Sequence, residues 1–167
     1  LLRGLDWGLF APPTKKTKAV IHTHALHQIR APIDIQLSTT PSAQDVLILL
    51  NKYMRPHSFT RLKFNHVAIV SKEGKVLGYK TIMLGKWLDK RLREEKKQPK
   101  RDAKRNPFIF IRKRLEKSKE LSNMGFPLAA YAELHIAMTL LRKLGLKSRA
   151  TPMPGYVFKD GYFQIKI

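Results

Sequence analysis

The residues with the strongest chemical signal in this chain form a basic run at positions 86–119. The run holds 15 Lys and Arg against five Asp and Glu, so its net charge is +10. Lys and Arg at this density neutralise phosphates and release the counterions condensed on a nucleic acid. A solvated helix face with internal ion pairs would carry more acid. We therefore expect this run to contact a phosphate backbone.

Aromatic and further basic residues complete the predicted surface. Phe108 and Phe110 lie inside the run and could stack on unpaired bases, although we expect them to anchor the segment to the core. A second group of cations lies near the N-terminus. The side chains predicted to bind RNA are Lys15, Lys16, Lys18, Lys86, Lys90, Arg91, Arg93, Lys96, Lys97, Lys100, Arg101, Lys104, Arg105, Arg112, Lys113 and Arg114.

A histidine cluster is the one group of residues with the spacing of metal ligands. His22 and His24 would share one face of a strand, and His27 could complete a three-ligand site. The closest acid in the sequence is Asp34, and three ligands on one face need a rigid fold around them. We therefore predict no metal site, and expect these histidines to belong to an RNA-facing extension.

Glu133 and His135 are the candidates for acid–base catalysis. A carboxylate buried in an apolar helix can act as a general acid or base with a raised pKa. Two residues at i and i+2 of a helix point in different directions, however, so we expect Glu133 to pair with a Lys or Arg instead. The chain also lacks a phosphate-binding glycine loop, a GxSxG motif and an HExxH motif. The sequence therefore predicts no enzyme, no cofactor and no small-molecule substrate.

The total charge agrees with a polyanionic partner. The 167 residues carry 33 Lys and Arg and 12 Asp and Glu, a formal net charge of +21. A compact domain with this much like charge repels itself unless a polyanion such as nucleic acid lies beside it. Hydrophobic residues make up 43% of the chain, which is enough for a folded core.

Composition also excludes several classes of protein. The chain has no Cys, which excludes a disulfide framework and a Cys-based zinc site. No apolar run approaches the roughly 20 residues that a transmembrane helix needs, so we predict no membrane span. The first residue is Leu1 rather than Met. Either the N-terminus has been processed or the sequence lacks its first residues, and removal of a transit peptide would place the protein in an organelle.

The pattern along the chain predicts one domain behind an N-terminal extension. Residues 1–32 combine a few apolar anchors with Pro12, Pro13 and a basic stretch, so we expect an arm that drapes over a partner or over the domain. Residues 33–167 are predicted to form a single RNA-binding domain in which segment 86–119 is basic and helical.

Alternating apolar and polar residues predict strands, and turn residues predict two hairpins. Gly74 supplies the positive φ for the first turn. Asp160 and Gly161 form the second turn, because Asp-Gly between alternating residues is a strong hairpin signal. The predicted strands are residues 33–37, 64–70, 76–83, 156–158 and 162–167.

Apolar spacing and capping residues predict the helices. The first is expected to start at Thr40 as its cap, with Pro41 at the first helical position. Trp87 and Leu128 are expected on packed faces of later helices, and Gly145 should end the last one. The predicted helices are residues 40–55, 84–97, 112–121 and 127–144, and residues 107–111 fit either a strand or the start of a helix.

This order of elements predicts an α+β fold. We expect a mixed or antiparallel sheet with two hairpins, packed by three to four helices, plus an extended basic N-terminal arm. A small, very basic, cysteine-free chain with such a body and basic extensions resembles ribosomal proteins. The extension, with its Trp7, Phe10 and prolines, looks more like that of an organellar ribosomal protein than a cytosolic one.

The resemblance implies a function and a location. It implies a structural constituent of the mitochondrial ribosome, in the mitochondrial matrix, with rRNA and neighbouring ribosomal proteins as partners. Duplex RNA is recognised mainly through its backbone and minor-groove shape, so scattered Lys and Arg suffice for such binding. Two alternatives stay open. One is a free-standing RNA- or DNA-binding factor in organellar translation or nucleoids, and the other is an RNA-processing enzyme that uses Glu133 or the histidines.

Overall fold

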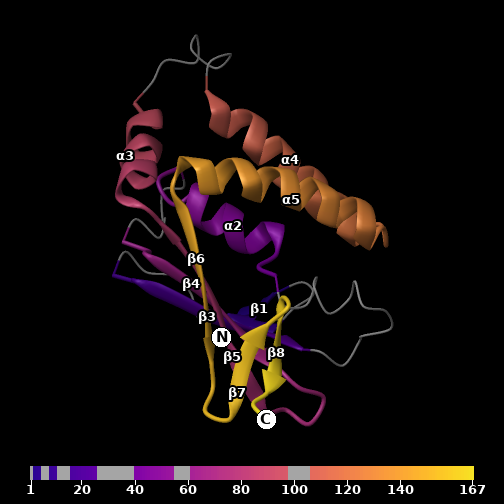
Figure 1. Ribbon diagram of the computed structural model, residues 1–167. Coiled ribbons are helices and arrows are strands. Elements are labelled where there is room, and N and C mark those ends of the chain that lie inside the picture. The colour runs from indigo at the N-terminus through magenta and orange to yellow at the C-terminus, as the bar shows by residue number, and fades with distance from the viewer. Residues whose placement is uncertain (1, 5–7, 11–15, 26–39, 55–60, 98–105) are drawn as a thin grey trace.

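The computed structural model describes residues 2–4, 8–10, 16–25, 40–54, 61–97 and 106–167 (Figure 1). The predicted strand at 33–37 and the predicted boundary between residues 32 and 33 lie outside these residues. The elements are β1 (Leu2–Gly4), β2 (Gly8–Phe10), β3 (Ala19–Ala25), α2 (Ala43–Leu50), β4 (Phe64–Val70), β5 (Val76–Leu84), α3 (Lys86–Glu95), α4 (Pro107–Asn123), α5 (Pro127–Leu144), β6 (Leu146–Pro152), β7 (Tyr156–Lys159) and β8 (Tyr162–Ile165).

The fold is α+β, which confirms the prediction. The described part of the chain contains four helices and a mixed four-stranded sheet in the order β3-β4-β5-β6. Strand β3 runs parallel to β4, and the other neighbouring strands are antiparallel. Two separate hairpins, β1–β2 and β7–β8, complete the strands.

The two edge strands of the sheet were not predicted. Ala19–Ala25 lie within the predicted N-terminal extension, yet they form β3 and pair with β4 along its whole length. Leu146–Pro152 form β6 beside β5, where only the first residue of the strand is buried. An edge strand with exposed polar side chains lacks the apolar alternation that marks a strand in a sequence. Its place is set by pairing with residues far away in the chain.

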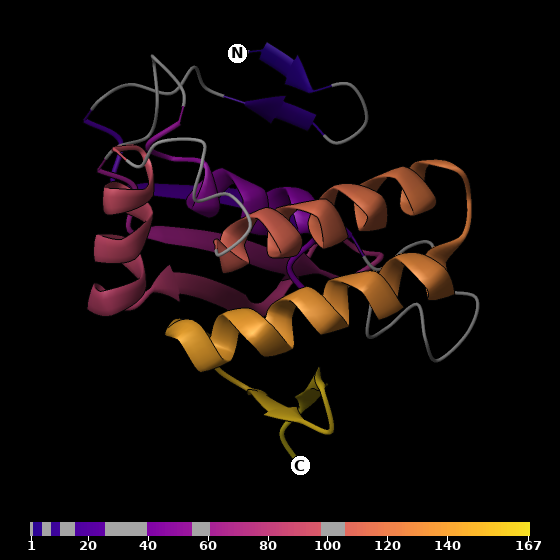
Figure 2. The ribbon, with the colours of Figure 1, turned by 90° about the horizontal axis from the view of Figure 1, so that it is seen from above.

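All four helices lie on one face of the sheet (Figures 1 and 2). Helices α4 and α5 pack side by side, and α4 also packs against α2. The core between helices and sheet contains Ile82 of β5, Leu50 of α2, Leu88 of α3, Ile111 of α4 and Leu141 of α5, each at most 1% exposed. A continuous core of this kind holds the charged outer surfaces of α3 and α4 in place.

The hairpin β7–β8 covers the far end of the same sheet face. Phe163 of β8 packs with Val67 and Ile69 of β4 in a second small core. Gly78 lies beneath that ring, because a Cβ on Gly78 would come within 2.4 Å of it. The turn has Asp160 at φ 55° and Gly161 at φ 88°, so the predicted Asp-Gly hairpin is confirmed.

The structure corrects the predicted start of the first helix. Helix α2 begins after Ser42, whose hydroxyl accepts a hydrogen bond from the backbone N–H of Asp45, while the Asp45 carboxylate accepts one from the N–H of Ser42. This reciprocal capping box satisfies two N–H groups at the start of the helix, so the cap is Ser42 and not the predicted Thr40. The helix ends at Leu50, before the predicted Arg55.

The later helices follow the prediction more closely. Helix α4 starts at Pro107 with Asn106 as its cap, so residues 107–111 begin a helix and not a strand. Helix α5 has the predicted bounds and ends at Gly145 with φ 111°. The packed faces were partly wrong: Trp87 is 55% exposed and Leu128 is 65% exposed. Smaller residues, such as Ala130 and Ala137, take the packed positions of α5.

Candidate nucleic-acid interface

Helix α3 carries a line of four cations along its solvent side, which we call the α3 stripe. Its members are Lys86, Lys90, Arg93 and, in the turn after the helix, Lys97, and all four are exposed. Their spacing of i, i+4, i+7 and i+11 places them on one face, about one cation per 5.4 Å turn. Leu88 and Leu92 are buried on the opposite face. The helix is therefore anchored by its apolar side and presents positive charge to solvent.

Carboxylates near the stripe are mostly engaged with the fold. Asp89 lies 2.7 Å from the ammonium of buried Lys52 and accepts a hydrogen bond from the Tyr53 hydroxyl. Arg93 reaches the same carboxylate only at 3.6 Å. Glu94 is 43% exposed and lies 3.9 Å from Lys90. The charge of the stripe is thus left largely unbalanced at the surface.

Arg112 is held inside the fold by a network of hydrogen bonds. Its guanidinium donates to the Glu95 carboxylate at 2.8 Å, to Oδ1 of Asn51 at 2.8 Å and to the backbone carbonyl of Leu50 at 3.2 Å. The side chains of Arg112 and Glu95 are only 16% and 8% exposed. Arg112 therefore joins α4 to α3 and α2, and it has little capacity left for a phosphate.

Arg114 and Glu133 form a second such pair between α4 and α5. The guanidinium donates to both carboxylate oxygens, at 2.9 and 3.2 Å, and Lys117 lies 3.6 Å away. The hydrogen bond from Arg114 lowers the pKa of Glu133 below its ordinary value. A general acid at neutral pH needs the opposite shift. The exposed His135 ring stacks with Tyr131, 6.1 Å away, and not with Glu133.

Trp87 adds an exposed aromatic ring beside the stripe. The guanidinium of Arg91, one turn further along α3, lies 5.7 Å from the centre of the ring. Arg91 is 46% exposed and also approaches Glu94 at 3.6 Å. An aromatic ring paired with a guanidinium is a surface on which a nucleobase or sugar can rest.

The structure adds cations that the sequence prediction missed, which we call the C-terminal basic cluster. Gly85 N–H donates to the Gly145 carbonyl at 2.8 Å, and this contact joins the start of α3 to the end of α5. The positions just before and after Gly145 thus lie near the start of α3, where Lys86 begins the stripe. Segment 142–149 contains four cations and no acid, and that local signal could have been read from the sequence. The cluster consists of Arg142, Lys143, Lys147 and Arg149, all exposed.

The other predicted RNA-binding residues divide into two groups. Lys16, Lys18, Lys96 and Lys113 are exposed, with Lys16 and Lys18 just ahead of β3. The remainder, which are Lys15, Lys100, Arg101, Lys104 and Arg105, lie outside the described residues.

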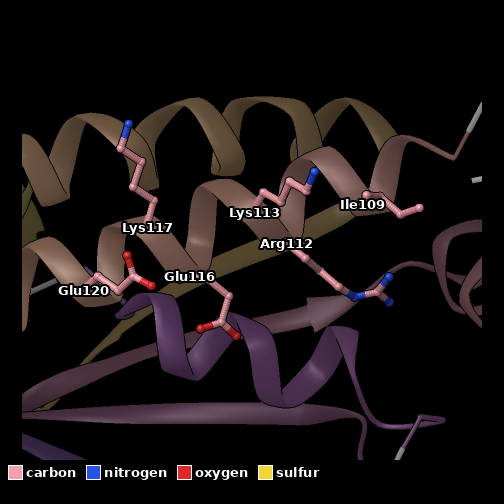
Figure 3. A pocket seen from close by; sticks show the side chains of 6 residues that line it. All are labelled: Ile109, Arg112, Lys113, Glu116, Lys117 and Glu120. Carbon is pink, nitrogen blue, oxygen red and sulfur yellow. The ribbon is translucent and has the colours of Figure 1, made fainter. Parts of the chain in front are cut away.

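A shallow hollow runs along α4, with Lys113, Lys117, Glu116 and Glu120 among its lining residues (Figure 3). Arg112 also lines it, but its charge is engaged with Glu95. Two lysines and two carboxylates thus line the hollow, which offers a phosphate much less net charge than the α3 stripe does.

The histidine cluster has a partner that the sequence did not indicate. Nε2 of His22 lies 2.8 Å from the carboxylate of Asp45, with side chains 14% and 7% exposed. Among the described residues, the acid beside His22 is therefore Asp45 of α2, which is distant in sequence. Asp34, His27 and the side chain of His24 lie outside what the structure describes. Within the described residues, no three His, Asp or Glu side chains gather as metal ligands would.

Known proteins give no further information about the site. No protein-family model matches the chain, and no curated protein and no solved structure matches it either. Among the described helices, none is both long and apolar enough to cross a membrane.

Proposed function

We propose that this protein binds RNA through the α3 stripe and the adjoining C-terminal basic cluster, as a structural component of a ribonucleoprotein. The observation that carries the proposal is the separation of charges. Asp89, Glu95 and Glu133 are engaged in ion pairs within the fold, and the Asp45 carboxylate contacts His22 and the Ser42 N–H. Among the described residues, the exposed cations of the α3 stripe and of β6 approach no buried carboxylate closer than 3.6 Å. Counterion release favours such a surface on a phosphate backbone.

The mitochondrial ribosome is the particle that we propose. The support is the resemblance in composition: a net charge of +21, no Cys and a small α+β body with a basic surface. In this function the protein performs no reaction. The cations bind rRNA phosphates, and the remaining surface contacts neighbouring ribosomal proteins. Location in the mitochondrial matrix is part of the same proposal.

The salt dependence of RNA binding tests the proposed surface. Replacing Lys86, Lys90, Arg93 and Lys97 with Gln should weaken binding of duplex RNA. If each cation neutralises one phosphate, the slope of log K against log salt should flatten by about 3, at about 0.7 to 0.9 per contact. Raising the salt from 50 to 200 mM lowers the affinity of the wild type by a certain factor. For the variant, that factor should be roughly 50 to 150 times smaller.

A charge-matched variant serves as the control. Replacing Lys72, Lys75, Lys159 and Lys166 with Gln removes the same four charges from exposed positions elsewhere. The slope of this variant should stay close to that of the wild type. Equal flattening in both variants would show that total charge, and not the α3 stripe, determines binding.

Sedimentation of the full chain with mitochondrial ribosomes tests the particle. An association that survives high salt is expected of a structural component buried among rRNA helices. Association with many RNAs that dissociates in high salt would instead favour a free-standing RNA- or DNA-binding factor, and would contradict the ribosomal assignment.

A further inference from the structure

The face of the four-stranded sheet opposite the helices is a second surface with its own composition. The four described helices and the β7–β8 hairpin lie on the other face (Figures 1 and 2). Side chains alternate along a strand, so Ile82 and Lys80 of β5 point to the covered face, and Tyr79, Thr81 and Met83 to the open one.

The register extends this open face across the sheet. Tyr79 lies opposite Ala68, and Met83 opposite Phe64. Thr81 lies opposite His66 on one side and Arg149 on the other. Ile21 of β3, opposite His66, is 65% exposed, which shows that the face is accessible at this edge.

Three flat rings lie on the open face, at half-buried positions. The rings of Phe64 and His66 are stacked, with centres 5.7 Å apart and planes inclined by 17°. Nδ1 of His66 is 2.7 Å from the Thr81 hydroxyl, which holds the imidazole in place. Tyr79 lies in the next strand, and the small Ala68 opposite it is buried. Half-buried rings held by their neighbours can offer a face to a ligand at a low entropic cost.

The charge of this sheet selects the kind of partner. None of the strands β3, β4, β5 and β6 contains an Asp or Glu. Lys147 and Arg149 of β6 are exposed and point to the open face, because Leu146 and Ala150 occupy the packed one. Aromatic rings beside cations with no carboxylate among them match a single-stranded nucleic acid, in which unpaired bases stack and phosphates bind the cations.

We propose that the open sheet face binds a single-stranded RNA segment by stacking unpaired bases on Tyr79 and on the Phe64–His66 pair. The inference rests on the proposed RNA-binding function and adds a second mode to it. The α3 stripe binds phosphates of any RNA, whereas the sheet face distinguishes unpaired from paired RNA. Lys147 and Arg149 belong to the C-terminal basic cluster, so one RNA can pass from the stripe to the sheet face.

Binding of matched 12-nucleotide RNAs tests the proposal. The probes are a uridine-rich single strand, an abasic strand with the same number of phosphates, and a duplex of equal length. We expect Tyr79→Leu to weaken binding of the base-containing strand by about 5- to 150-fold, the range of a lost aromatic–base stack. Binding of the abasic strand and of the duplex should be unchanged.

Tyr162→Leu is the matched control, because Tyr162 is 38% exposed on the separate β7–β8 hairpin. It should leave all three affinities unchanged. Leu keeps much of the apolar contact of Tyr79, and thermal unfolding of the variant verifies its fold. If Tyr79→Leu does not fold, the wild-type chain decides: it should bind the base-containing strand at least about 5-fold more tightly than the abasic one.

Each contrary outcome has a separate meaning. Equal binding of the base-containing and abasic strands, with intact duplex binding, overturns the sheet-face proposal alone. Loss of binding to all three probes in the wild-type chain overturns the proposed function itself. A dimer in sedimentation that dissociates on Tyr79→Leu, together with equal binding of the two strands, would assign the face to a second copy and overturn the proposal.

Discussion

Replacing Arg112 with Met should destabilise the protein strongly without changing the salt dependence of RNA binding. The sequence grouped Arg112 with the phosphate ligands, whereas the structure surrounds its guanidinium with Glu95, Asn51 and the Leu50 carbonyl. Met keeps the length of the side chain and removes the charge and the donors. The Glu95 carboxylate, 8% exposed, would then retain the Asn106 side-chain amide at 2.7 Å as a donor but lose its counter-charge.

The size of the effect follows from this burial. Removing one partner of a buried ion pair costs about 3 to 5 kcal/mol, because the other charge is left uncompensated. For a chain of this length each kcal/mol shifts Tm by about 2 to 4 °C, so Tm should fall by about 6 to 20 °C. Arg91→Met is the control, since Arg91 and Glu94 are 46% and 43% exposed and 3.6 Å apart. An exposed pair of this kind contributes at most about 1 kcal/mol.

Thermal and urea unfolding measure the two variants, and RNA titrations well below Tm measure the salt slope. The double variant Arg112→Met with Glu95→Leu should recover at least half of the lost stability, because the buried carboxylate is then absent. Two results would refute the reasoning. One is a loss of unfolding free energy in Arg112→Met no larger than that in Arg91→Met. The other is a slope of log K against log salt that flattens in Arg112→Met by about 0.7 to 0.9, the amount expected for one phosphate contact.

Two further predictions concern the C-terminal hairpin. Lys80 lies under Phe158, with Nζ 4.4 Å from the ring centre, and its burial, together with the charge of Arg142, lowers its pKa. The unfolded chain therefore binds more protons than the folded one between the lowered and the ordinary pKa, so stability should rise with pH in that alkaline window. Lys80→Met should raise Tm at pH 7, and the gain should shrink towards pH 10, whereas a gain that does not depend on pH would contradict the assigned cause. Gly78→Ala should cost about 1 to 3 kcal/mol in urea unfolding, because its Cβ would overlap the Phe163 ring, and Phe163→Leu should relieve part of this cost. An additive double variant would show that the two residues do not clash.

The elements that the sequence predicted correctly are those specified by neighbouring residues. Helix α5 has an apolar face with a 3.6-residue period, starts with Pro127 and ends at Gly145. The turns at Gly74 and at Asp160 and Gly161 need positive φ, which these residue types adopt readily. The excess of Lys and Arg over Asp and Glu likewise needs no structure to be counted, and it indicates the class of partner.

The features that the sequence did not reveal depend on residues far apart in the chain. Strand β3 is recognised only by its pairing with β4, about 45 positions later, and β6 only by its pairing with β5. The role of Arg112 depends on Glu95 and Asn51, which two other elements bring to it. The open sheet face exists because all four described helices pack on one side. Composition therefore determined that the protein is strongly basic and has enough apolar residues for a core, since net charge and apolar content are both sums over residues. Tertiary structure decided which cations are engaged with buried carboxylates and which face solvent, because ion pairing and burial depend on distances that the order of residues does not contain.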